Sequence, residues 1–231
     1  MKSSKLMWNE VWANSKIIAP HEIVLQQIKK LQINHVLEIG AGSGVDVEAL
    51  VKMGYDVTFT DLSEVAIEKF KDRNPNIKAK ECDARNLPFK NNSFDLVYCL
   101  GLLEHFGESD RQKIIKEMLR VSKRYILIDV PQRYSLLTII KKILMFFRMW
   151  KYGDEIEFSH FQLINEVKRV DKNLKICSMY GRGILPLPRN FRSIFYEYIV
   201  KGKIKDVYFK LQEKMYWCWF NCFGIIFEKR Y

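Results

Sequence analysis

The segment Glu38-Ile39-Gly40-Ala41-Gly42-Ser43-Gly44 constrains the fold more than any other part of this chain. It follows the apolar, β-branched run His35–Ile39, which is typical of a buried strand, and it precedes an apolar pattern at helical spacing over Val45–Met53. Glycines allow a sharp turn and let the backbone approach a ligand closely. The sequence therefore predicts a strand, a tight loop and a helix, with a ligand site at the loop.

Further strands and helices alternate over the first 130 residues. Predicted strands cover Asp56–Thr60, Ile77–Glu81, Phe94–Leu100 and Arg124–Val130, and predicted helices cover 63–70, with Ser63 as N-cap, and Asp110–Val121. Sequential strands joined by helices pair in parallel with right-handed crossovers, so we expect an α/β, Rossmann-like, doubly wound sheet. A helix over 162–170 and strands over Lys175–Tyr180 and Phe223–Lys229 are expected to follow, and these two strands can pair with each other.

Composition sets the broad class of the protein. Of 231 residues, 48% are hydrophobic and 13% aromatic, which is enough for one buried core, so we expect a single domain over residues 1–231. The net charge of +11 favours encounters with phosphates, nucleic acid or anionic membranes without selecting among them. The five cysteines form no CxxC pair, so we expect no metal site and no disulfide framework. Residues 1–20 lack the pattern of a secretory signal, which favours a cytoplasmic location.

The spacing of the glycines argues against NAD as the ligand. The dinucleotide fingerprint G-x-G-x-x-G would place its third glycine at position 45, where this chain has Val45, and the third glycine is Gly44 instead. The carboxylate of Glu38, just before the loop, would repel a pyrophosphate but suits a cationic or zwitterionic ligand. We therefore expect a cofactor that is not recognised through phosphates.

These residues resemble the class I S-adenosylmethionine-dependent methyltransferases, specifically the small-molecule group that includes the ubiquinone and menaquinone biosynthesis methyltransferases. The resemblance covers most of the chain, and Val36–Gly44 looks like the family's first motif. It implies a seven-stranded, mostly parallel sheet with an antiparallel last strand, and S-adenosylmethionine as the cofactor. It also implies that the methionine and ribose portions lie against Glu38, Gly40, Ala41, Gly42 and Gly44.

Two more segments carry the same resemblance. Asp61 and the adjoining Leu62 follow the second predicted strand, where an acidic side chain can accept both hydrogen bonds from a ribose diol. The segment Cys82–Phe89 is similar to the family's D-A-x-x-L-P-F segment, which implies that Asp83 accepts from the adenine amino group and that the amide of Ala84 reads the ring. Cys82 stands where the family often has glycine.

The end of the strand Phe94–Leu100 is expected to face the chemistry. The resemblance places Leu100 in the cofactor site, beside the reactive methyl group, and His105 follows shortly after it. An imidazole with an ordinary pKa near 6.5 suits proton removal at neutral pH, so His105 is our candidate catalytic base; a plain helix-start histidine is the alternative. Methyl transfer from a sulfonium is a displacement that positioning alone can promote, so a base is optional.

The acceptor is less constrained than the cofactor. Residues 133–160 and 184–221 are where we expect lid or substrate-cover insertions, and the basic, apolar run Tyr134–Trp150 is open to three interpretations: a lid, a peripheral membrane contact, or core. An apolar cover favours a small-molecule acceptor that is aromatic or lipid-like. RNA or protein methylation, suggested by the charge, and a non-catalytic cofactor-binding adaptor acting through the aromatic C-terminal region remain alternatives. No nucleic-acid-binding signature accompanies the lysines of residues 201–210, so nucleic acid is not the expected partner, and the oligomeric state is left open.

Overall fold

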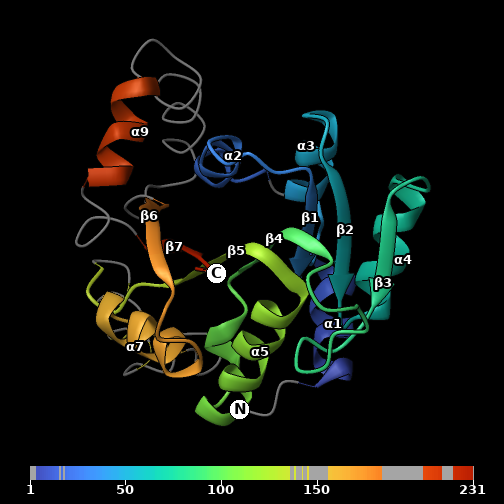
Figure 1. Ribbon diagram of the computed structural model, residues 1–231. Helices are drawn as coiled ribbons and strands as arrows, with labels where there is room; N and C mark the ends of the chain where they lie inside the picture. Colours follow the sequence, from blue (N-terminus) through green and yellow to red (C-terminus); the bar gives the residue numbers. More distant parts are fainter. Residues whose placement is uncertain are drawn as a thin grey trace.

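The computed structural model describes residues 4–15, 17, 19–135, 138, 142, 145, 156–183, 205–214 and 221–230 (Figure 1). Its strands are β1 (His35–Ile39), β2 (Asp56–Asp61), β3 (Lys78–Glu81), β4 (Phe94–Leu100), β5 (Ser122–Pro131), β6 (Lys175–Arg182) and β7 (Cys222–Glu228). Its helices are α1 (Lys5–Asn14), α2 (Glu22–Lys29), α3 (Val45–Lys52), α4 (Glu64–Arg73), the 3-10 helix η1 (Leu103–His105), α5 (Glu108–Val121), α7 (His160–Val170) and α9 (Lys205–Lys214).

The described strands form one seven-stranded sheet in the order β3-β2-β1-β4-β5-β7-β6. Strands β1 to β5 pair in parallel, and β7 runs antiparallel to both β5 and β6. This confirms the predicted Rossmann-like sheet, its antiparallel last strand, and the pairing of Lys175–Tyr180 with the C-terminal strand. The strand order reverses between β1 and β4, so a crevice is expected where the carboxyl ends of these strands meet.

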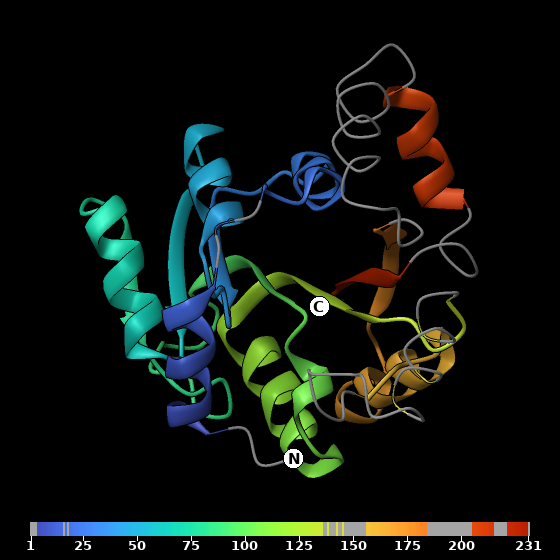
Figure 2. The ribbon, with the colours of Figure 1, turned by 180° about the vertical axis from the view of Figure 1, so that it is seen from behind.

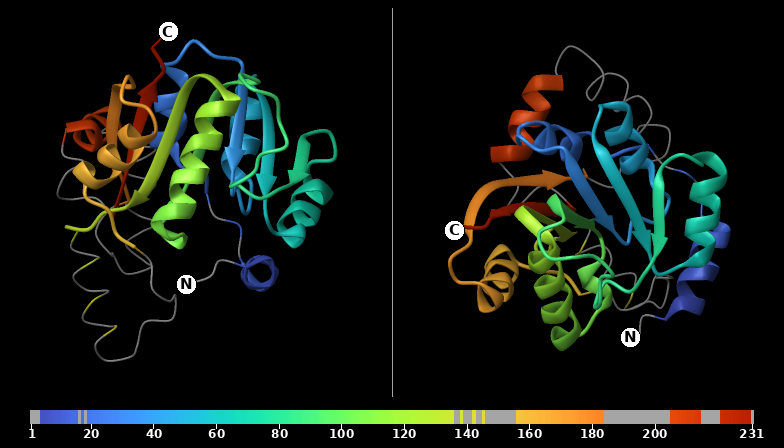
Figure 3. Two further views of the ribbon diagram at one scale, coloured as in Figure 1. Left: turned by 60° about the horizontal axis from the view of Figure 1, so that its bottom comes forward. Right: turned by 45° about the vertical axis from the view of Figure 1, so that its right-hand side comes forward.

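Helices cover both faces of the sheet (Figures 1 and 3). Helices α5 and α7 pack on one face, where a buried ion pair of 2.6 Å joins Arg111 to Glu166. Helices α2, α3, α4 and α9 pack on the other, around an apolar cluster that includes Phe59 and Phe70, whose rings stack with centroids 4.1 Å apart. Ser63 caps α4 by accepting a hydrogen bond from the Ala66 amide, as its position predicts.

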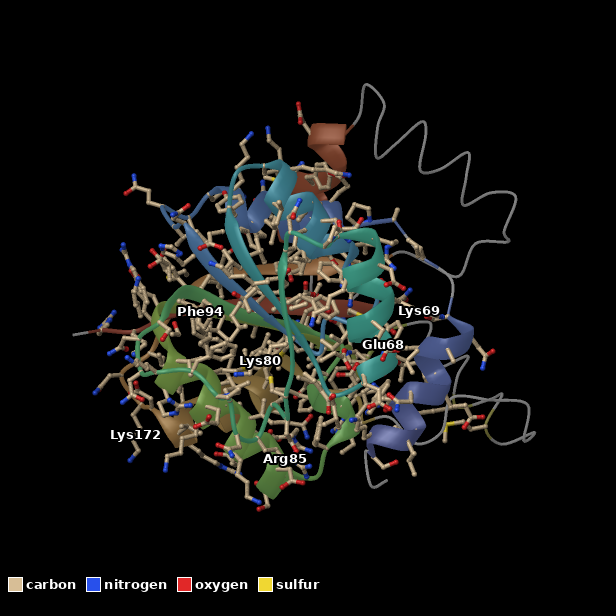
Figure 4. The ribbon with its side chains drawn as sticks, turned by 90° about the vertical axis from the view of Figure 1, so that its right-hand side faces the viewer. Glu68, Lys69, Lys80, Arg85, Phe94 and Lys172 are labelled. Atoms are coloured by element: carbon tan, nitrogen blue, oxygen red, sulfur yellow. The ribbon has the colours of Figure 1, made fainter. Side chains whose placement is uncertain are left out.

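Helices α1 and α2 are not among the elements predicted from the sequence. Helix α1 lies alongside α4 (Figure 2) and buries none of its residues fully. Polar contacts attach it: Lys5 forms a 2.9 Å ion pair with Glu64, and the ammonium of Lys69 donates to the carbonyls of Trp12 and Ala13. Figure 4 shows Lys69 on the side of α4 that faces α1. These polar contacts hold α1 against α4.

The predicted covers fall largely outside the described residues. This applies to most of 133–160 and 184–221, to most of Tyr134–Trp150, and to residues 216–220, which make up the aromatic part of the C-terminal region. Within the described part, Phe158 is buried and forms an isolated parallel bridge with Gln132 after β5. Across the residues that the structure describes, no helix is both long and apolar enough to cross a membrane.

Candidate functional site

A cavity of about 330 Å³ lies at the carboxyl ends of the parallel strands, next to the glycine loop. Eight of the predicted cofactor residues line it, and the candidate base His105 lines it as well. These eight are Glu38, Gly40, Ala41, Asp61, Leu62, Asp83, Ala84 and Leu100. The structure therefore brings together residues from the ends of β1, β2, β3 and β4, as the resemblance implies. Gly42 and Gly44 do not line the cavity; they shape the loop beside it.

The loop is built on left-handed backbone at all three glycines. Gly40, Gly42 and Gly44 have φ values of 65°, 54° and 72°, which side-chain-bearing residues rarely adopt. The amide of Gly42 donates a 2.8 Å hydrogen bond to Asp61 Oδ2, which ties the loop to the end of β2. A Cβ at Gly44 would overlap the ring of Phe70, so this glycine also allows the Phe70 side chain of α4 to pack against the loop.

Buried carboxyl groups surround the loop. Glu38 is 3% exposed and accepts a 2.7 Å hydrogen bond from the Tyr98 hydroxyl. Burial raises the pKa of Glu38 well above its ordinary value, and the neighbouring Asp46 and Asp61 raise that pKa further, whereas the bond from Tyr98 lowers it. The cavity wall therefore presents carboxyl oxygens, which accept hydrogen bonds and suit donor groups better than a phosphate.

Asp61 lies where β2 ends and is 5% exposed. Its Oδ1 atom accepts from the Ser63 amide at 2.8 Å, while Oδ2 holds Gly42. Burial raises the pKa of Asp61, and hydrogen bonds from the backbone of Ser63 and Gly42 act in the opposite direction. The backbone of Leu62 also bonds this carboxylate, whose two oxygens have about four acceptor sites, so capacity for a ligand hydroxyl remains.

Asp83 has a partner that the sequence did not indicate. Its carboxylate forms a 2.6 Å ion pair with Arg85, which also bonds Asp110 at the start of α5 at 3.0 Å (Arg85 in Figure 4). The hydrogen bond from Arg85 lowers the pKa of Asp83 more than any other influence. The group is thereby held ionised at the cavity wall.

Aromatic residues of α1 close one side of the cavity. Trp8, Val11 and Trp12 line it, and the Trp8 ring meets His105 edge-on with ring centroids 4.8 Å apart. None of the three was predicted as a site residue. The only sequence signal was the i, i+4 spacing of the two tryptophans, which places them on one face of a helix.

Two further polar groups in the lining were also missed. His21 precedes α2, and both its backbone N–H and its Nδ1 atom lie 2.7 Å from the carboxylate of Asp46, which is 4% exposed. Arg182, at the end of β6, forms a 2.6 Å ion pair with Asp129, which is fully buried in β5. Both lining residues are therefore held by an aspartate from another element.

Comparisons with known proteins show which sequences this chain resembles. Residues 36–124 match the model of a family described as a methyltransferase domain. A demethylmenaquinone methyltransferase of Renibacterium salmoninarum is 32% identical over 115 residues, which are 50% of this chain and 48% of that protein. A ubiquinone biosynthesis O-methyltransferase of Coxiella burnetii is 35% identical over 103 residues, 43% of each chain. The chain thus spans about half the length of the curated relatives it matches, or less.

Solved structures share the fold over nearly the whole chain. An S-adenosylmethionine-dependent methyltransferase from Thermotoga maritima superposes with a TM-score of 0.63 at 16% identity, covering 97% of this chain and 94% of that one. Magnesium protoporphyrin IX methyltransferase from Synechocystis, solved with S-adenosylhomocysteine, gives 0.59 at 13% identity, covering 98% and 83%. These comparisons confirm the predicted resemblance and the predicted fold.

Proposed function

We propose that this chain transfers the methyl group of S-adenosylmethionine to a small-molecule acceptor and releases S-adenosylhomocysteine. One observation carries the proposal: a cavity beside the glycine loop is lined by Glu38, Asp61 and Asp83, which come from the ends of three adjacent parallel strands. The ribose, adenine and ammonium of S-adenosylmethionine present hydrogen-bond donors, and its sulfonium and ammonium are cationic, so the ligand suits a wall of carboxyl acceptors that repels a phosphate.

Each predicted cofactor residue receives a role in this proposal. Asp61 accepts from the ribose hydroxyls, and Asp83 accepts from the adenine amino group while the amide of Ala84 faces the ring. Glu38 and the backbone of the loop face the methionine and ribose portions, with Leu100 beside the methyl group. Gly40, Ala41 and Leu62 give the ligand its close backbone approach, and Gly42 and Gly44 shape the loop that carries them.

The acceptor is proposed to be aromatic or lipid-like, on the basis of the aromatic wall and the relatives' names. Trp8, Trp12 and Phe106 contribute apolar surface to the cavity, and two relatives are named for quinone biosynthesis. His105 lines the same cavity and stays our sequence-based candidate for the catalytic base. A cytoplasmic location belongs to the same proposal.

Calorimetric titration of the purified protein tests the cofactor part without knowledge of the acceptor. We expect S-adenosylmethionine and S-adenosylhomocysteine to bind and NADH not to bind. Binding of NADH alone would overturn the proposal in favour of a dehydrogenase. Binding of both adenosyl ligands without methyl transfer to any extract of small molecules would favour the adaptor, and transfer that is lost after nuclease treatment would favour RNA as the acceptor.

A further inference from the structure

A histidine–carboxylate pair faces the proposed methyl-transfer cavity from a side that the sequence did not identify. The Nδ1 atom of His21 lies 2.7 Å from Asp46 Oδ2, and Oδ1 of the same carboxylate accepts from the His21 amide, also at 2.7 Å. The His21 side chain is 23% exposed and that of Asp46 is 5% exposed. The Asp46 carboxylate accepts two hydrogen bonds from His21, one from its backbone and one from its ring, and these fix the position and the orientation of the imidazole.

This contact sets the tautomer of the neutral imidazole. An ionised carboxylate only accepts hydrogen bonds, so the proton of His21 belongs on Nδ1, and the lone pair is left on Nε2. Nε2 makes no hydrogen bond to any residue within the described ranges. Acyl-transfer triads use the same arrangement: a buried aspartate orients an imidazole, and the second nitrogen of that imidazole takes the proton.

Arg182, the last residue of β6, adds a positively charged side chain to the lining of the same cavity. Its Nε and Nη2 atoms donate to the Asp129 carboxylate at 2.6–3.0 Å, and Nη1 makes no hydrogen bond to the described residues. Among the described residues, Arg182 is the one lysine or arginine that lines the cavity. Its side chain is 18% exposed, so a ligand oxygen anion would meet it with little competition from water.

We propose that His21, oriented by Asp46, removes the proton from the methyl acceptor, and that Arg182, oriented by Asp129, binds the oxygen anion that forms. The inference rests on the proposed methyl transfer and deepens it, because it assigns the acceptor to compounds with a weakly acidic O–H, such as phenols and enols. Asp46 and Asp129 act as positioning residues.

The step balances without a further reactant. His21 Nε2 takes the acceptor proton, and the acceptor oxygen forms a bond to the methyl carbon as the S–CH3 bond breaks. The electron pair of that bond stays on sulfur, which becomes the neutral thioether of S-adenosylhomocysteine, and the imidazolium then releases its proton to water. An oxygen anion attacks a sulfonium carbon faster than a neutral hydroxyl does, so the pair supplies chemistry that positioning alone does not.

Other titratable groups line the same cavity and are tested alongside His21. They are Glu38, Asp61, Cys82, Asp83 and His105. Burial raises the pKa of the Cys82 thiol to about 11, so this group is protonated at neutral pH. His105, which contacts Trp8, is the competing candidate for the base.

The chain offers a matched control for the histidine–aspartate pair. His35 Nδ1 lies 3.1 Å from Asp56 Oδ2, so it has the same kind of partner, but its side chain is 46% exposed and it lies at the amino end of β1, away from the cavity. H35N therefore removes an imidazole beside a carboxylate without touching the site. H21N, H21Q and D46N test the pair, R182Q tests the cation, and H105N tests the competitor.

The experiment uses the complex with S-adenosylhomocysteine, and 4-nitrophenol and 4-nitrocatechol as probes, whose anions are coloured. At a pH where the free phenols are mostly protonated, we expect the wild-type complex and H35N to bind them as anions. We expect H21N, H21Q and R182Q to bind them about tenfold or more weakly and without the anion's colour, since a hydrogen bond to a charged group contributes about 1.5–3 kcal/mol. D46N should show an intermediate loss.

Several outcomes would overturn the inference, and they are separable from failure of the proposed function. Equal anion binding by wild type, H21N and R182Q would overturn the roles of His21 and Arg182. Loss of anion binding in H105N alone would also overturn them. Failure of both phenols to bind, or preference for 4-nitroaniline, would contradict the O–H class. Weaker binding of S-adenosylhomocysteine but not of 5′-methylthioadenosine by H21N or R182Q would assign that residue to the cofactor's amino acid instead. If wild type does not bind S-adenosylhomocysteine at all, the proposed function itself fails.

Discussion

The hydroxyl of Tyr98 donates a 2.7 Å hydrogen bond to Glu38 Oε2, and both side chains are buried beneath the glycine loop. The two residues face each other across neighbouring strands, since Glu38 of β1 and Tyr98 of β4 are in register. The bond fixes the one carboxyl group that immediately precedes the loop. It therefore links the sheet to the conformation of the cofactor site.

Tyr98→Phe removes this donor and leaves a buried carboxyl oxygen without a partner. The free energy of unfolding should fall by about 1–3 kcal/mol, which is the cost of an unsatisfied buried polar group. Urea denaturation of both proteins measures the change. Tyr55→Phe is the control, because Tyr55 is only half-buried and should shift stability by no more than about 0.5 kcal/mol. Equal effects of the two variants would contradict the importance of the Tyr98–Glu38 bond.

The raised pKa of Glu38 predicts a pH dependence of stability with a definite sign. The folded state binds this proton more tightly than the unfolded state, whose value lies near the ordinary 4.5. The resulting stabilisation is complete below that value and is lost as pH rises toward the folded-state pKa. The stability of wild type relative to Glu38→Gln should therefore decline as pH rises above the ordinary carboxyl value, measured by urea denaturation at several pH values. A rising or constant difference would show that the carboxyl is not held protonated.

Gly44 is predicted to matter for packing as well as for backbone conformation. Gly44→Ala places a methyl group on left-handed backbone and into the ring of Phe70, so we expect a loss of about 2–5 kcal/mol in unfolding free energy. Gly54 also has positive φ, but a Cβ there meets nothing within 4 Å. Gly54→Ala should therefore cost only the backbone strain, about 1–2 kcal/mol. Denaturation that gave equal losses for the two variants would argue against a steric role for Gly44.

The parallel sheet and the glycine loop could be predicted because their signals are local. The run His35–Ile39 is apolar enough to read as a buried strand, and glycines mark the turn that follows. Predicted and observed bounds coincide for β1 and β4 and differ by one to three residues elsewhere. Helix α1 gave only a weak signal, the i, i+4 spacing of Trp8 and Trp12, because none of its residues is fully buried.

The acceptor side of the site depends on contacts between distant segments, which no local pattern reveals. His21 and Asp46 are 25 residues apart, and they meet only because α2 and α3 pack on the same face of the sheet. Arg182 reaches Asp129 across β7, a strand that follows both of them in the chain. By contrast, His105 could be proposed as a site residue from the sequence because it closely follows the end of β4.

Asp61 provides the most direct test of the proposed cofactor orientation. Asp61→Asn keeps the shape of the side chain and one acceptor oxygen for either the Gly42 or the Ser63 amide, and it removes the charge that would accept from the ribose hydroxyls. We expect S-adenosylhomocysteine to bind about 10–100-fold more weakly in calorimetry, because hydrogen bonds to a charged acceptor contribute about 1.5–3 kcal/mol. Asp56→Asn is the control: Asp56 begins the same strand, is paired with Lys78, and lies at the end remote from the cavity, so the affinity should not change. Unchanged affinity in Asp61→Asn would mean that the ribose is held elsewhere, and that the acidic end of β2 serves only to brace the glycine loop.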